Sequence, residues 1–566
     1  MKRPAKLWAT VDIETGRDGR VLAVGLYYTE KSRAVYQELP GWPEFLRQIE
    51  QRKIGKVYAH NGGGFDYLSL LRVLPPDWTW DGIVVGGKLI SATIRRGEYT
   101  CRLVDSFRIA PVGLDKLSRS LLSVGKLEDA ATDHPEDLFT RDSARFSDYL
   151  RSDCQLLYDC VNKMTAIYKE ISPQFSGLGL TAGGTALKLW RSMEPMPYFR
   201  PQDQKVNLIL RAGYKGGRCE CFQPGEFNAV KCFDVNSMYP WAMKKASVPL
   251  SGRVMLTKNF RGQPGIWQIE FAQSRGHVPA LMVNGTGEYS GTGWYYTPEI
   301  VAAINAGVKI KVIVGLQFMD YSTDLFSAFI DKLWQTRETY GPQSAFGTVA
   351  KLAMNNLYGK MGQGDTIESL IRSDDTKMLI EKRARPVDAE ENLWSISENS
   401  ECEYQHYGIA GTITSYSRAH LMGLLWDNRP IYCDTDSIHT RENIAPSKGL
   451  GGLKLEKTAE IGIYCGRKMY GLLADGRENI RIKGVRCGTE PEILENKDSL
   501  KWFINLRMMR ELLQNKTLTA KYRSFPTLNE VFRKQIQPCR AIARTRIIRM
   551  LKRESQALNQ SSLTSQ

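Results

Sequence analysis

The chain lacks the patterns of the common zinc and disulfide proteins. Its 11 cysteines are scattered with no C-x-x-C pair, and among only six histidines there is no H-E-x-x-H. These absences argue against a zinc site or a disulfide framework and favour reduced thiols in a cytosol. No apolar run reaches the roughly 18 residues that span a bilayer, and the N-terminus has no apolar signal-peptide core. We therefore expect neither membrane insertion nor secretion.

Positive charge is in excess. Lysine and arginine number 77 against 61 acidic residues, which gives a net charge of +16. Such an excess is typical of proteins that bind a polyanion, either nucleic acid or an anionic membrane surface. The length of 566 residues predicts several domains. A hydrophobic content of 42% is ordinary for a globular protein and allows a large core.

The stretch YCDTDSIHT at residues 432–440 places two aspartates one residue apart among strand-forming residues. Side chains two residues apart on an extended backbone point to the same face, so Asp434 and Asp436 are predicted to lie side by side. Two carboxylates that close repel each other unless a positive charge offsets them. Two interpretations stay open: a solvated hairpin tip, since Asp, Thr and Ser are turn residues, or a divalent-metal site.

Another carboxylate at a strand end would complete such a metal site. The stretch CFDVNSMYP at 232–240 supplies Asp234, and Pro240 predicts that the strand ends there. Aspartates at two strand ends can hold two Mg²⁺ ions about 4 Å apart, which stabilise the attacking and leaving oxygens of phosphoryl transfer. The expected chemistry is therefore phosphoryl transfer with two Mg²⁺ ions in the site, for which Mn²⁺ can substitute.

A predicted helix, KLAMNNLYGK at 351–360, offers groups that suit a nucleotide. Lys351 and Tyr358 are seven residues apart and so share a helical face. A lysine can bind a triphosphate, and a tyrosine ring can stack on a base. Taken alone, the stretch is better explained as an amphipathic surface helix.

Together these stretches resemble the motifs of family B DNA polymerases, in the order of that family. DVNSMYP resembles motif A, KLAMNNLYG motif B and YCDTDS motif C. KMY at 468–470 resembles the K-x-Y motif, and YKGGRCE at 214–220 resembles the Y-x-G-G element that couples synthesis to proofreading. The chain departs from the family pattern at two positions, with Met238 for a leucine and Asn356 for a serine.

The resemblance implies a role for each matched residue. Asp234 and Asp436 would hold the metals, with Val235 as a further ligand and Asp434 assisting. Tyr239 would pack beneath the sugar and exclude a 2′-hydroxyl. The other implied contacts are with the nucleotide, through Lys351, Arg337, Tyr358 and Asn355, and with DNA, through Tyr214, Gly216, Gly217, Lys468 and Tyr470.

The N-terminal part carries a second set of acidic residues. TVDIETG at 10–16 places Asp12 and Glu14 on one face of a predicted strand, and Asp66 opens a predicted helix. Tyr149 and Asp153 are four residues apart on one helical face. Any one of these acids alone is equally well explained as a surface charge.

As a set, these residues resemble the DEDDy 3′–5′ exonucleases. The resemblance implies that the four carboxylates hold two metals that activate water, and that Tyr149 orients this water. Lys126, in VGKLEDA, lies near the position of a catalytic lysine in related phage enzymes. Contacts with DNA are implied for Asn61, Phe65, Ser106 and Phe107.

Chain length and two inserted segments narrow the resemblance to the short, protein-primed branch of family B. AHNGG, TAGGTA, GGRC and DVNSMYP are most similar to the enzymes of tailless, lipid-containing, tectivirus-type phages. The implied fold is an α/β and α+β multidomain one. It has an RNase H-like (DEDDy) exonuclease domain at 1–185, a palm at 186–260 and 406–485, fingers at 326–363, terminal-protein-region insertions at 261–325 and 364–405, and a thumb-like basic C-terminal region at 486–566.

Local patterns predict the secondary structure. KLWATVDIET and VLAVGLYY predict strands, and DYLSLLRVL, FSDYLRSDCQLLYDCVNKM and residues 326–360 predict helices. SGLGLTAGGTALK at 176–188 is predicted to be a connection. Residues 364–405 are predicted to be polar and irregular, with room for a hairpin around downstream DNA. CRAIARTRIIRMLKR at 539–553 predicts an amphipathic helix, either solvated or clamping phosphates.

The primary hypothesis is a DNA-directed DNA polymerase with 3′–5′ proofreading and strand displacement. It would replicate a linear viral genome in the host cytoplasm as a monomer, with template and primer DNA, dNTPs, a terminal protein and a single-stranded-DNA-binding protein as partners. A primer-independent or plasmid-type family B replicase remains an alternative. Intact motifs A and C argue against a repair nuclease, and seven acids placed in motifs argue against a non-catalytic DNA-binding protein.

Overall fold

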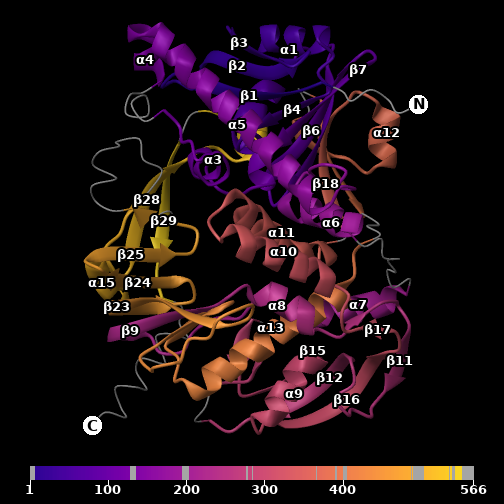
Figure 1. Cartoon of the computed structure of the whole chain (residues 1–566), viewed down its shortest axis with the longest axis vertical. Helices are drawn as coiled ribbons and strands as arrows, with labels where there is room; N and C mark the ends of the chain where they lie inside the picture. The colour runs from indigo at the N-terminus through magenta and orange to yellow at the C-terminus, as the bar shows by residue number, and fades with distance from the viewer. Residues whose placement is uncertain are drawn as a thin grey trace. The chain divides into compact units, whose positions relative to one another are not determined.

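The chain forms two compact units, whose elements are labelled in Figure 1. The first unit is Met1–Met196, Lys332–Cys402 and Phe525–Ile542, and the second is Pro197–Asp331, Glu403–Ser524 and Ala543–Gln566. The structure is a computed structural model. It describes residues 7–127, 135–193, 203–275, 278–283, 285–364, 366–388, 392–399, 404–485, 487–488, 502–514, 516–534, 536–537, 539 and 542–550.

A ten-stranded mixed sheet is the centre of the first unit (Figure 1). Its strands lie in the order β19 (Arg385–Asp388), β20 (Leu393–Asn399), β18 (Thr366–Arg372), β5 (Thr79–Val85), β6 (Lys88–Arg96), β7 (Tyr99–Asp105), β4 (Lys56–Ala59), β1 (Trp8–Thr15), β2 (Val21–Glu30) and β3 (Arg33–Leu39). β4 is parallel to both β1 and β7. Along β1 the side chains alternate, so Val11 and Ile13 enter the core while Asp12 and Glu14 take the other face.

Helices accompany this sheet in the first unit. They are α1 (Trp42–Gln51), α2 (Asp66–Arg72), α3 (Leu114–Leu122), α4 (Pro135–Arg141), α5 (Ser143–Ile171), α6 (Ala182–Met193), α11 (Ala345–Met361), α12 (Thr376–Glu381) and α16 (Leu528–Arg533), with short 3₁₀ turns η1 (Gly62–Gly64) and η2 (Ser106–Arg108). α10 (Ser327–Tyr340) contains the boundary between the units. The long α5 packs on β1 and β2, and Asp142 caps its N-terminus by accepting the Arg145 N–H at 3.0 Å.

The predicted connection at 176–188 is wrong from Ala182 onward, where α6 begins. Thr181 acts as its cap, because its hydroxyl accepts the Gly184 N–H at 3.0 Å. The glycines allow close helix packing on α11, since a Cβ on Gly183 would lie 3.1 Å from the Asn356 carbonyl oxygen. Thr181 therefore caps a helix and Gly183 allows close packing, whereas the Gly- and Thr-rich composition of this stretch had suggested a loop.

The prediction of irregular structure at 364–405 is also wrong. β18 pairs with β5 and β20, and β19 adds one further strand at the edge of the sheet. Leu370 of β18 and Ile396 of β20 are buried, while their strand neighbours are more exposed. The alternating polar residues of TIESLIR and LWSISEN thus mark half-buried strands of an antiparallel sheet.

The second unit contains a seven-stranded antiparallel sheet (Figure 1). Its order is β25 (Arg477–Ile482), β24 (Met469–Ala474), β23 (Leu453–Gly466), β9 (Gly225–Val235), β22 (Ser437–Thr440), β21 (Tyr432–Asp434) and β8 (Cys219–Cys221). Its helices include α7 (Gln204–Gly213), α8 (Met238–Lys245), α13 (Tyr407–Asp427) and α15 (Leu506–Leu513).

Residues 261–325, called here the inserted segment, contribute most of a second sheet in this unit. The sheet has the order β11 (Val254–Thr257), β16 (Lys309–Phe318), β12 (Gly265–Ala272) and β15 (Ser290–Tyr296), and α9 (Thr297–Asn305) follows β15. Strand pairs complete the unit: β10 (Val248–Pro249) with β17 (Tyr321–Ser322), β13 (Leu281–Val283) with β14 (Thr286–Glu288), β26 (Cys487–Gly488) with β27 (Trp502–Phe503), and β28 (Leu518–Ser524) with β29 (Ile542–Ile548).

α13 is the central helix of the second unit and packs against α8 and α9. Most of its residues are buried, which agrees with apolar residues on all sides of the helix. No helix in the described ranges, α13 included, is long and apolar enough to cross a membrane.

The amphipathic helix predicted at 539–553 is wrong where that stretch is described, because Ile542–Ile548 form β29. Three isoleucines and Thr545 lie within these seven residues, and such β-branched side chains favour a strand over a helix. The apolar and arginine residues are interspersed in a pattern that suits both the period of a helix and the period of a strand. Strand pairing with β28 decides between them.

The pairing of β18 with the sheet generates a stability prediction. Leu370 is 1% exposed, so Leu370→Asp buries a carboxylate without a partner and should release residues 366–399 from the sheet. We expect faster tryptic cleavage at Arg372, Lys382 and Arg383 than in the unmodified chain. Ser397→Asp, at an exposed position of the paired strand β20, is the matched control. Equal cleavage rates in both variants would contradict the packing of this strand.

Candidate active sites

Acidic residues from three elements converge in the first unit. β1 carries Asp12 and Glu14, α2 begins at Asp66, and α5 carries Asp153. Carboxylate oxygens of Asp12, Glu14 and Asp153 lie within 4.8 Å of one another, the one such set of three potential metal ligands among the described residues. Asp66 and Asp153 are buried, with exposures of 3% and 1%. The fold thus brings together acids that lie in three distant parts of the sequence.

Burial and mutual repulsion disfavour the charged forms of these acids. Burial, followed by the charge of Asp153, raises the pKa of Asp12 to about 7. Burial and then the Asp12 charge also raise the pKa of Glu14 and of Asp66. One oxygen each of Asp66 and Asp153 is buried with no hydrogen-bond partner among the described residues. Buried, crowded oxygens of this kind fit a divalent cation, which supplies the missing positive charge.

One cationic side chain lies against this cluster. Lys126 Nζ forms an ion pair with Asp153 and lies 5.7 Å from the centre of the Tyr149 ring. Burial opposes the charge of Lys126, but Asp153 and Asp12 raise its pKa above the ordinary value. Tyr149 and Asp153 are one helical turn apart on α5. The two residues singled out beside the carboxylates in the sequence therefore lie beside them in space.

A buried aspartate that the sequence analysis missed orders the neighbouring loops. Asp105, with 0% exposure at the end of β7, accepts the Asn61 N–H at 2.9 Å and the Phe107 N–H at 3.0 Å. Asn61 has a φ of 67°, which this hydrogen bond helps to hold. The sequence offered one signal, since Asp105 directly precedes Ser106, which the resemblance had already marked.

The other two residues predicted to bind DNA in this unit, Ser106 and Phe65, are also packed in place. The Ser106 hydroxyl donates to the Ala59 carbonyl oxygen at 3.0 Å and lies 3.0 Å from His60 Nδ1. The Phe65 ring meets the Phe525 ring edge to face, with centroids 4.9 Å apart. Both side chains are therefore anchored in the first unit, which carries the acid cluster.

Asp434 and Asp436 lie at the tip of a β-hairpin. β21 ends at Asp434, which pairs with Ser437 at the start of β22. Thr435 has a φ of 62°, an uncommon conformation for a β-branched residue, and the Asp436 N–H donates to the Asp434 carbonyl oxygen at 2.7 Å. The predicted continuous strand is therefore wrong, because a turn separates the two acids. They lie at a hairpin tip, and the metal-site interpretation stays a prediction. The tip is not simply solvated, since the Asp434 side chain is 26% exposed.

The sheet places Asp234 beside this hairpin. Asp234, on β9, pairs with Ser437 of β22, and the Val235 N–H donates to the Asp436 carbonyl oxygen at 2.8 Å. Asp234, Asp434 and Asp436 line one cavity of about 400 Å³. The two sequence motifs that supply these acids lie about 200 residues apart in the chain. The fold places them on neighbouring strands of one antiparallel sheet.

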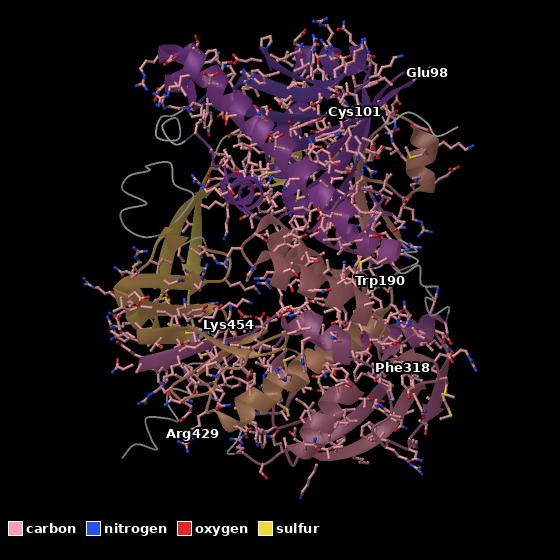
Figure 2. All side chains as sticks on the ribbon, viewed as in Figure 1. Glu98, Cys101, Trp190, Phe318, Arg429 and Lys454 are labelled. Carbon is pink, nitrogen blue, oxygen red and sulfur yellow. The ribbon has the colours of Figure 1, made fainter. Side chains whose placement is uncertain are left out.

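Two lysines lie beside these aspartates. Lys468 Nζ lies 2.7 and 2.8 Å from the two carboxylate oxygens of Asp434. Lys454, labelled in Figure 2, lies on β23 with its Nζ 3.8 Å from an oxygen of Asp234. Burial opposes the charge of Lys468, but its hydrogen bonds to Asp434 raise its pKa. The chain itself therefore supplies part of the charge that offsets the carboxylate repulsion.

Aromatic rings support the K-x-Y segment. The Tyr470 ring lies 5.0 Å from the Tyr432 ring and 5.3 Å from the His439 ring, and the Lys468 N–H donates to the Tyr432 hydroxyl at 3.3 Å. His439 Nδ1 lies 2.7 Å from the Tyr464 hydroxyl. Burial lowers the pKa of His439 to about 4, so this ring is neutral near pH 7. Lys468 and Tyr470 are thereby fixed against the strand that leads to Asp434.

The YKGG loop lies against the aspartate hairpin. The Arg218 carbonyl oxygen accepts the Thr435 N–H at 2.6 Å. A Cβ on Gly217 would lie 2.7 Å from the Thr435 side chain, so only glycine fits this approach. Tyr214 precedes the glycines, and its ring lies 6.0 Å from the Tyr407 ring. Gly216 contacts α13 through its carbonyl oxygen, which accepts a hydrogen bond from Arg418 Nη1 at 2.9 Å.

The candidate nucleotide-binding residues lie on three helices. Lys351, Asn355 and Tyr358 are at positions i, i+4 and i+7 of α11 and so share one face. Arg337 lies on α10, and burial lowers its pKa. Tyr239, on α8, belongs to the second unit, whereas the other four belong to the first.

Asn356, where family B has serine, has a local structural role in α11. Its side-chain amide donates to the Leu352 carbonyl oxygen at 2.8 Å, one helical turn back. The amide is therefore turned toward its own helix backbone. The serine-to-asparagine difference therefore leaves unchanged the face of α11 that carries Lys351 and Tyr358.

Comparisons with known proteins agree with this geometry. The family model of DNA polymerase type B, organellar and viral, matches residues 143–262 and 273–448, together more than half of the chain. The DNA-directed DNA polymerase of Enterobacteria phage PRD1 is 28% identical over 458 residues, which are 78% of this chain and 77% of that protein. The DNA polymerase of Bacillus phage phi29 is 25% identical over 326 residues, 51% of this chain and 54% of that protein.

Solved structures share the fold. Phi29 DNA polymerase complexed with primer-template DNA and incoming nucleotide substrates aligns with a TM-score of 0.73 and 18% identity, covering 97% of this chain and 100% of that one. The same polymerase complexed with single-stranded DNA gives a TM-score of 0.68 and 19% identity over 87% of this chain and 94% of that one. The predicted multidomain fold class is confirmed. With more than half of its residues matched by the family model, the chain belongs to the type B DNA polymerases of the organellar and viral group.

Proposed function

We propose that this DNA polymerase replicates a linear viral genome from a protein primer and proofreads with its own 3′–5′ exonuclease. One observation carries the proposal: the chain has two separate acid clusters, each with a lysine in contact with a carboxylate. Separate clusters suit two separate phosphoryl-transfer reactions. The solved phi29 complexes contain primer-template DNA and incoming nucleotides, which supports DNA and dNTPs as partners here.

In the proposed exonuclease, the cluster in the first unit holds two Mg²⁺ ions through Asp12, Glu14, Asp66 and Asp153. Ions held there would supply an activated water and stabilisation of the leaving oxygen of the terminal phosphodiester. Lys126 neutralises Asp153, and Tyr149 orients the water. The strand end is held by Asn61, Phe65, Ser106 and Phe107. A buried, preorganised site of this kind favours attack on a frayed single strand over a paired one.

In proposed synthesis, the cavity of the second unit holds the metal–triphosphate group. Asp234 and Asp436, with the backbone of Val235, would hold the ions, which would supply stabilisation of the charge that develops on the transferred phosphate. Asp434 assists through its ion pair with Lys468, which together with Tyr470 holds the primer end. Tyr239 packs beneath the sugar. The resemblance to family B supports Lys351, Arg337, Tyr358 and Asn355, which belong to the first unit, as further nucleotide-binding residues.

Priming by a terminal protein is supported by the inserted segment and by charge. A protein primer must occupy the channel that later holds duplex DNA, so its surface should be acidic where it imitates phosphates. The chain as a whole has a net charge of +16, and the inserted segment adds a local positive charge at two exposed lysines of β16, Lys309 and Lys311, the second of which lies 3.4 Å from Glu270. Residues 364–405 are the second proposed contact region.

The two proposed sites can be separated by mutation. Asp436→Ala should lower nucleotide addition roughly a thousandfold, about 4 kcal/mol of lost transition-state stabilisation. Digestion of single-stranded DNA should continue at the parental rate. The measurement is primer extension and exonuclease activity on the same preparation.

The reciprocal variant is the matched control. Asp12→Ala combined with Asp66→Ala should abolish digestion and leave primer extension intact, because the two acids belong to the other cluster. An unchanged rate of digestion would remove these acids from the exonuclease. Loss of both activities in either variant would mean that the two reactions share one site.

Priming is tested by charge reversal on the inserted segment. Lys309→Glu with Lys311→Glu should weaken labelled-nucleotide transfer to the terminal protein at least tenfold (about 1.4 kcal/mol). Extension of an annealed DNA primer should remain near parental. The difference should shrink as salt rises, because screening limits such attraction to about 8 Å at physiological ionic strength.

The alternative of a primer-independent replicase makes different predictions for the same assay. Equal loss of initiation and extension would make this surface a general DNA contact. If bare templates were copied readily while no protein accepted a nucleotide, the primer-independent alternative would replace protein priming.

A further inference from the structure

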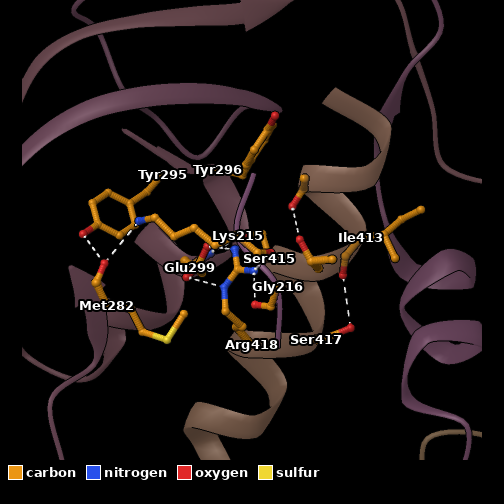
Figure 3. A network of polar contacts seen from close by, with 12 residues as sticks. Lys215, Gly216, Met282, Tyr295, Tyr296, Glu299, Ile413, Ser415, Ser417 and Arg418 are labelled. Atoms are coloured by element: carbon orange, nitrogen blue, oxygen red, sulfur yellow. Dashed lines mark hydrogen bonds and ion pairs between the residues drawn. The ribbon is translucent and has the colours of Figure 1, made fainter. Parts of the chain in front are cut away.

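A buried ion pair joins the inserted segment to the central helix of the second unit (Figure 3). Arg418, on α13, donates from Nε to Glu299 Oε1 at 2.9 Å, and its Nη2 contacts the other oxygen of Glu299, on α9. Both residues are 4% exposed. Burial opposes ionisation of Glu299, but the Arg418 guanidinium more than offsets this, and the pKa of Glu299 lies below its ordinary value. The pair is therefore charged and planar, with two parallel contacts.

The third nitrogen of the same guanidinium reaches the YKGG loop. Arg418 Nη1 donates to the Lys215 carbonyl oxygen and, at 2.9 Å, to the Gly216 carbonyl oxygen. One planar group thus binds a carboxylate on one side and two successive backbone carbonyls on the other, as Figure 3 shows. Because the guanidinium is rigid, the position of Glu299 fixes where these carbonyls lie.

A second set of contacts holds the same loop to the inserted segment. Lys215 Nζ lies 3.4 Å from the centre of the Tyr295 ring and donates to the Met282 carbonyl oxygen at 3.2 Å. The Tyr295 hydroxyl donates to the same carbonyl at 2.7 Å. Arg218 Nη1 donates to the Pro279 carbonyl oxygen at 2.7 Å. The YKGG loop therefore contacts the inserted segment through Lys215 and Arg218, which lie on either side of its two glycines.

The YKGG loop also contacts the hairpin turn that carries Asp434 and Asp436. Its Arg218 carbonyl oxygen accepts the Thr435 N–H at 2.6 Å, and Gly217 lies against the Thr435 side chain. Thr435 has a φ of 62°, an unfavourable conformation for threonine that outside contacts must hold. Asp434 and Asp436 flank this residue directly. A shift of the loop would therefore move both carboxylates.

We infer that Glu299 is a positioning residue for nucleotide addition, acting through Arg418 and the YKGG loop on the Asp434–Asp436 turn. The inserted segment then has a part in every catalytic cycle, beyond its proposed contact with a protein primer. This inference rests on the polymerase activity of the family and is independent of how synthesis is primed. The Glu299 side chain does not itself contact the cavity of the three aspartates.

The test is Glu299→Gln, which keeps the shape of the side chain and removes its charge. Single-nucleotide addition to an annealed DNA primer should show kcat lowered tenfold or more, with KM for the dNTP changed less than threefold. Digestion of single-stranded DNA should stay at the parental rate. Assays well below the unfolding temperature of each variant separate positioning from loss of folded protein.

The matched control is Glu226→Gln. Glu226 pairs with Arg510 through two contacts of 2.7 and 2.8 Å in the same unit, but the pair is exposed and away from the loop. Its kcat should equal that of the parent. Should Glu299→Gln fail to fold, Lys215→Met removes one support of the loop without leaving a buried charge unpaired, and it should lower kcat as well.

Two results would overturn the inference. One is a kcat within twofold of the parent in Glu299→Gln, or in Lys215→Met if the first variant does not fold. The other is an equal fall in polymerisation and digestion that follows the loss of folded protein, which would give Glu299 a role in stability alone.

Discussion

The crowding of carboxylates is the constraint on which this polymerase depends. Catalysis of phosphoryl transfer with metal ions requires several acids in one place, and the acids repel one another when no cation is near. In the first unit the cost is visible in Asp12, whose pKa rises to about 7, and in the buried oxygens of Asp66 and Asp153 that lack partners among the described residues. In the second unit Lys468 and Lys454 take up part of the charge.

Because repulsion pushes such acids apart, each must be held by a rigid element. Asp12 and Glu14 are held by an interior strand of a ten-stranded sheet, and Asp153 by a 29-residue helix packed on that sheet. Asp434 and Asp436 of the second unit depend on a hairpin with a strained Thr435, which the YKGG loop supports from outside. The inserted segment then supports the loop through Glu299 and Arg418. The rigidity of the Asp434–Asp436 turn thus depends on the YKGG loop, and the position of that loop depends on the more distant Glu299–Arg418 pair.

Much of this could be predicted from the sequence, and the exceptions have physical causes. Alternation in TVDIETG gave the correct strand and face for Asp12 and Glu14, because strand period alone decides it. The same rule failed for Asp434 and Asp436, where Thr435 takes a left-handed conformation that only tertiary contacts can hold. Gly183 and Gly184 were interpreted as loop, yet both lie in a helix, and Gly183 lies where that helix packs closely on α11.

The contacts between distant segments could not be predicted at all. Glu299 and Arg418 are 119 residues apart and carry no local pattern that marks them as a pair. The hydrogen bonds of Asp105 were missed because its partners are backbone N–H groups, which every residue type except proline has. Strands at 364–405 and at 542–548 were missed because their polar residues belong to half-buried sheets completed by other parts of the chain. Sequence motifs identify the acids, whereas the supports of those acids emerge only from the fold.

The central claim is that the buried acids of the first unit form a divalent-cation site, and thermal unfolding of the metal-free chain tests it. A raised folded-state pKa of Asp12 stabilises the fold at low pH, and this contribution is lost as pH rises through about 7. Added Mn²⁺ should therefore raise the Tm, and more at about pH 8 than at about pH 6, because metal binding requires ionised carboxylates. Asp12→Asn should remove most of this increase. An equal Mn²⁺-dependent increase in the parent and in Asp12→Asn would contradict the account.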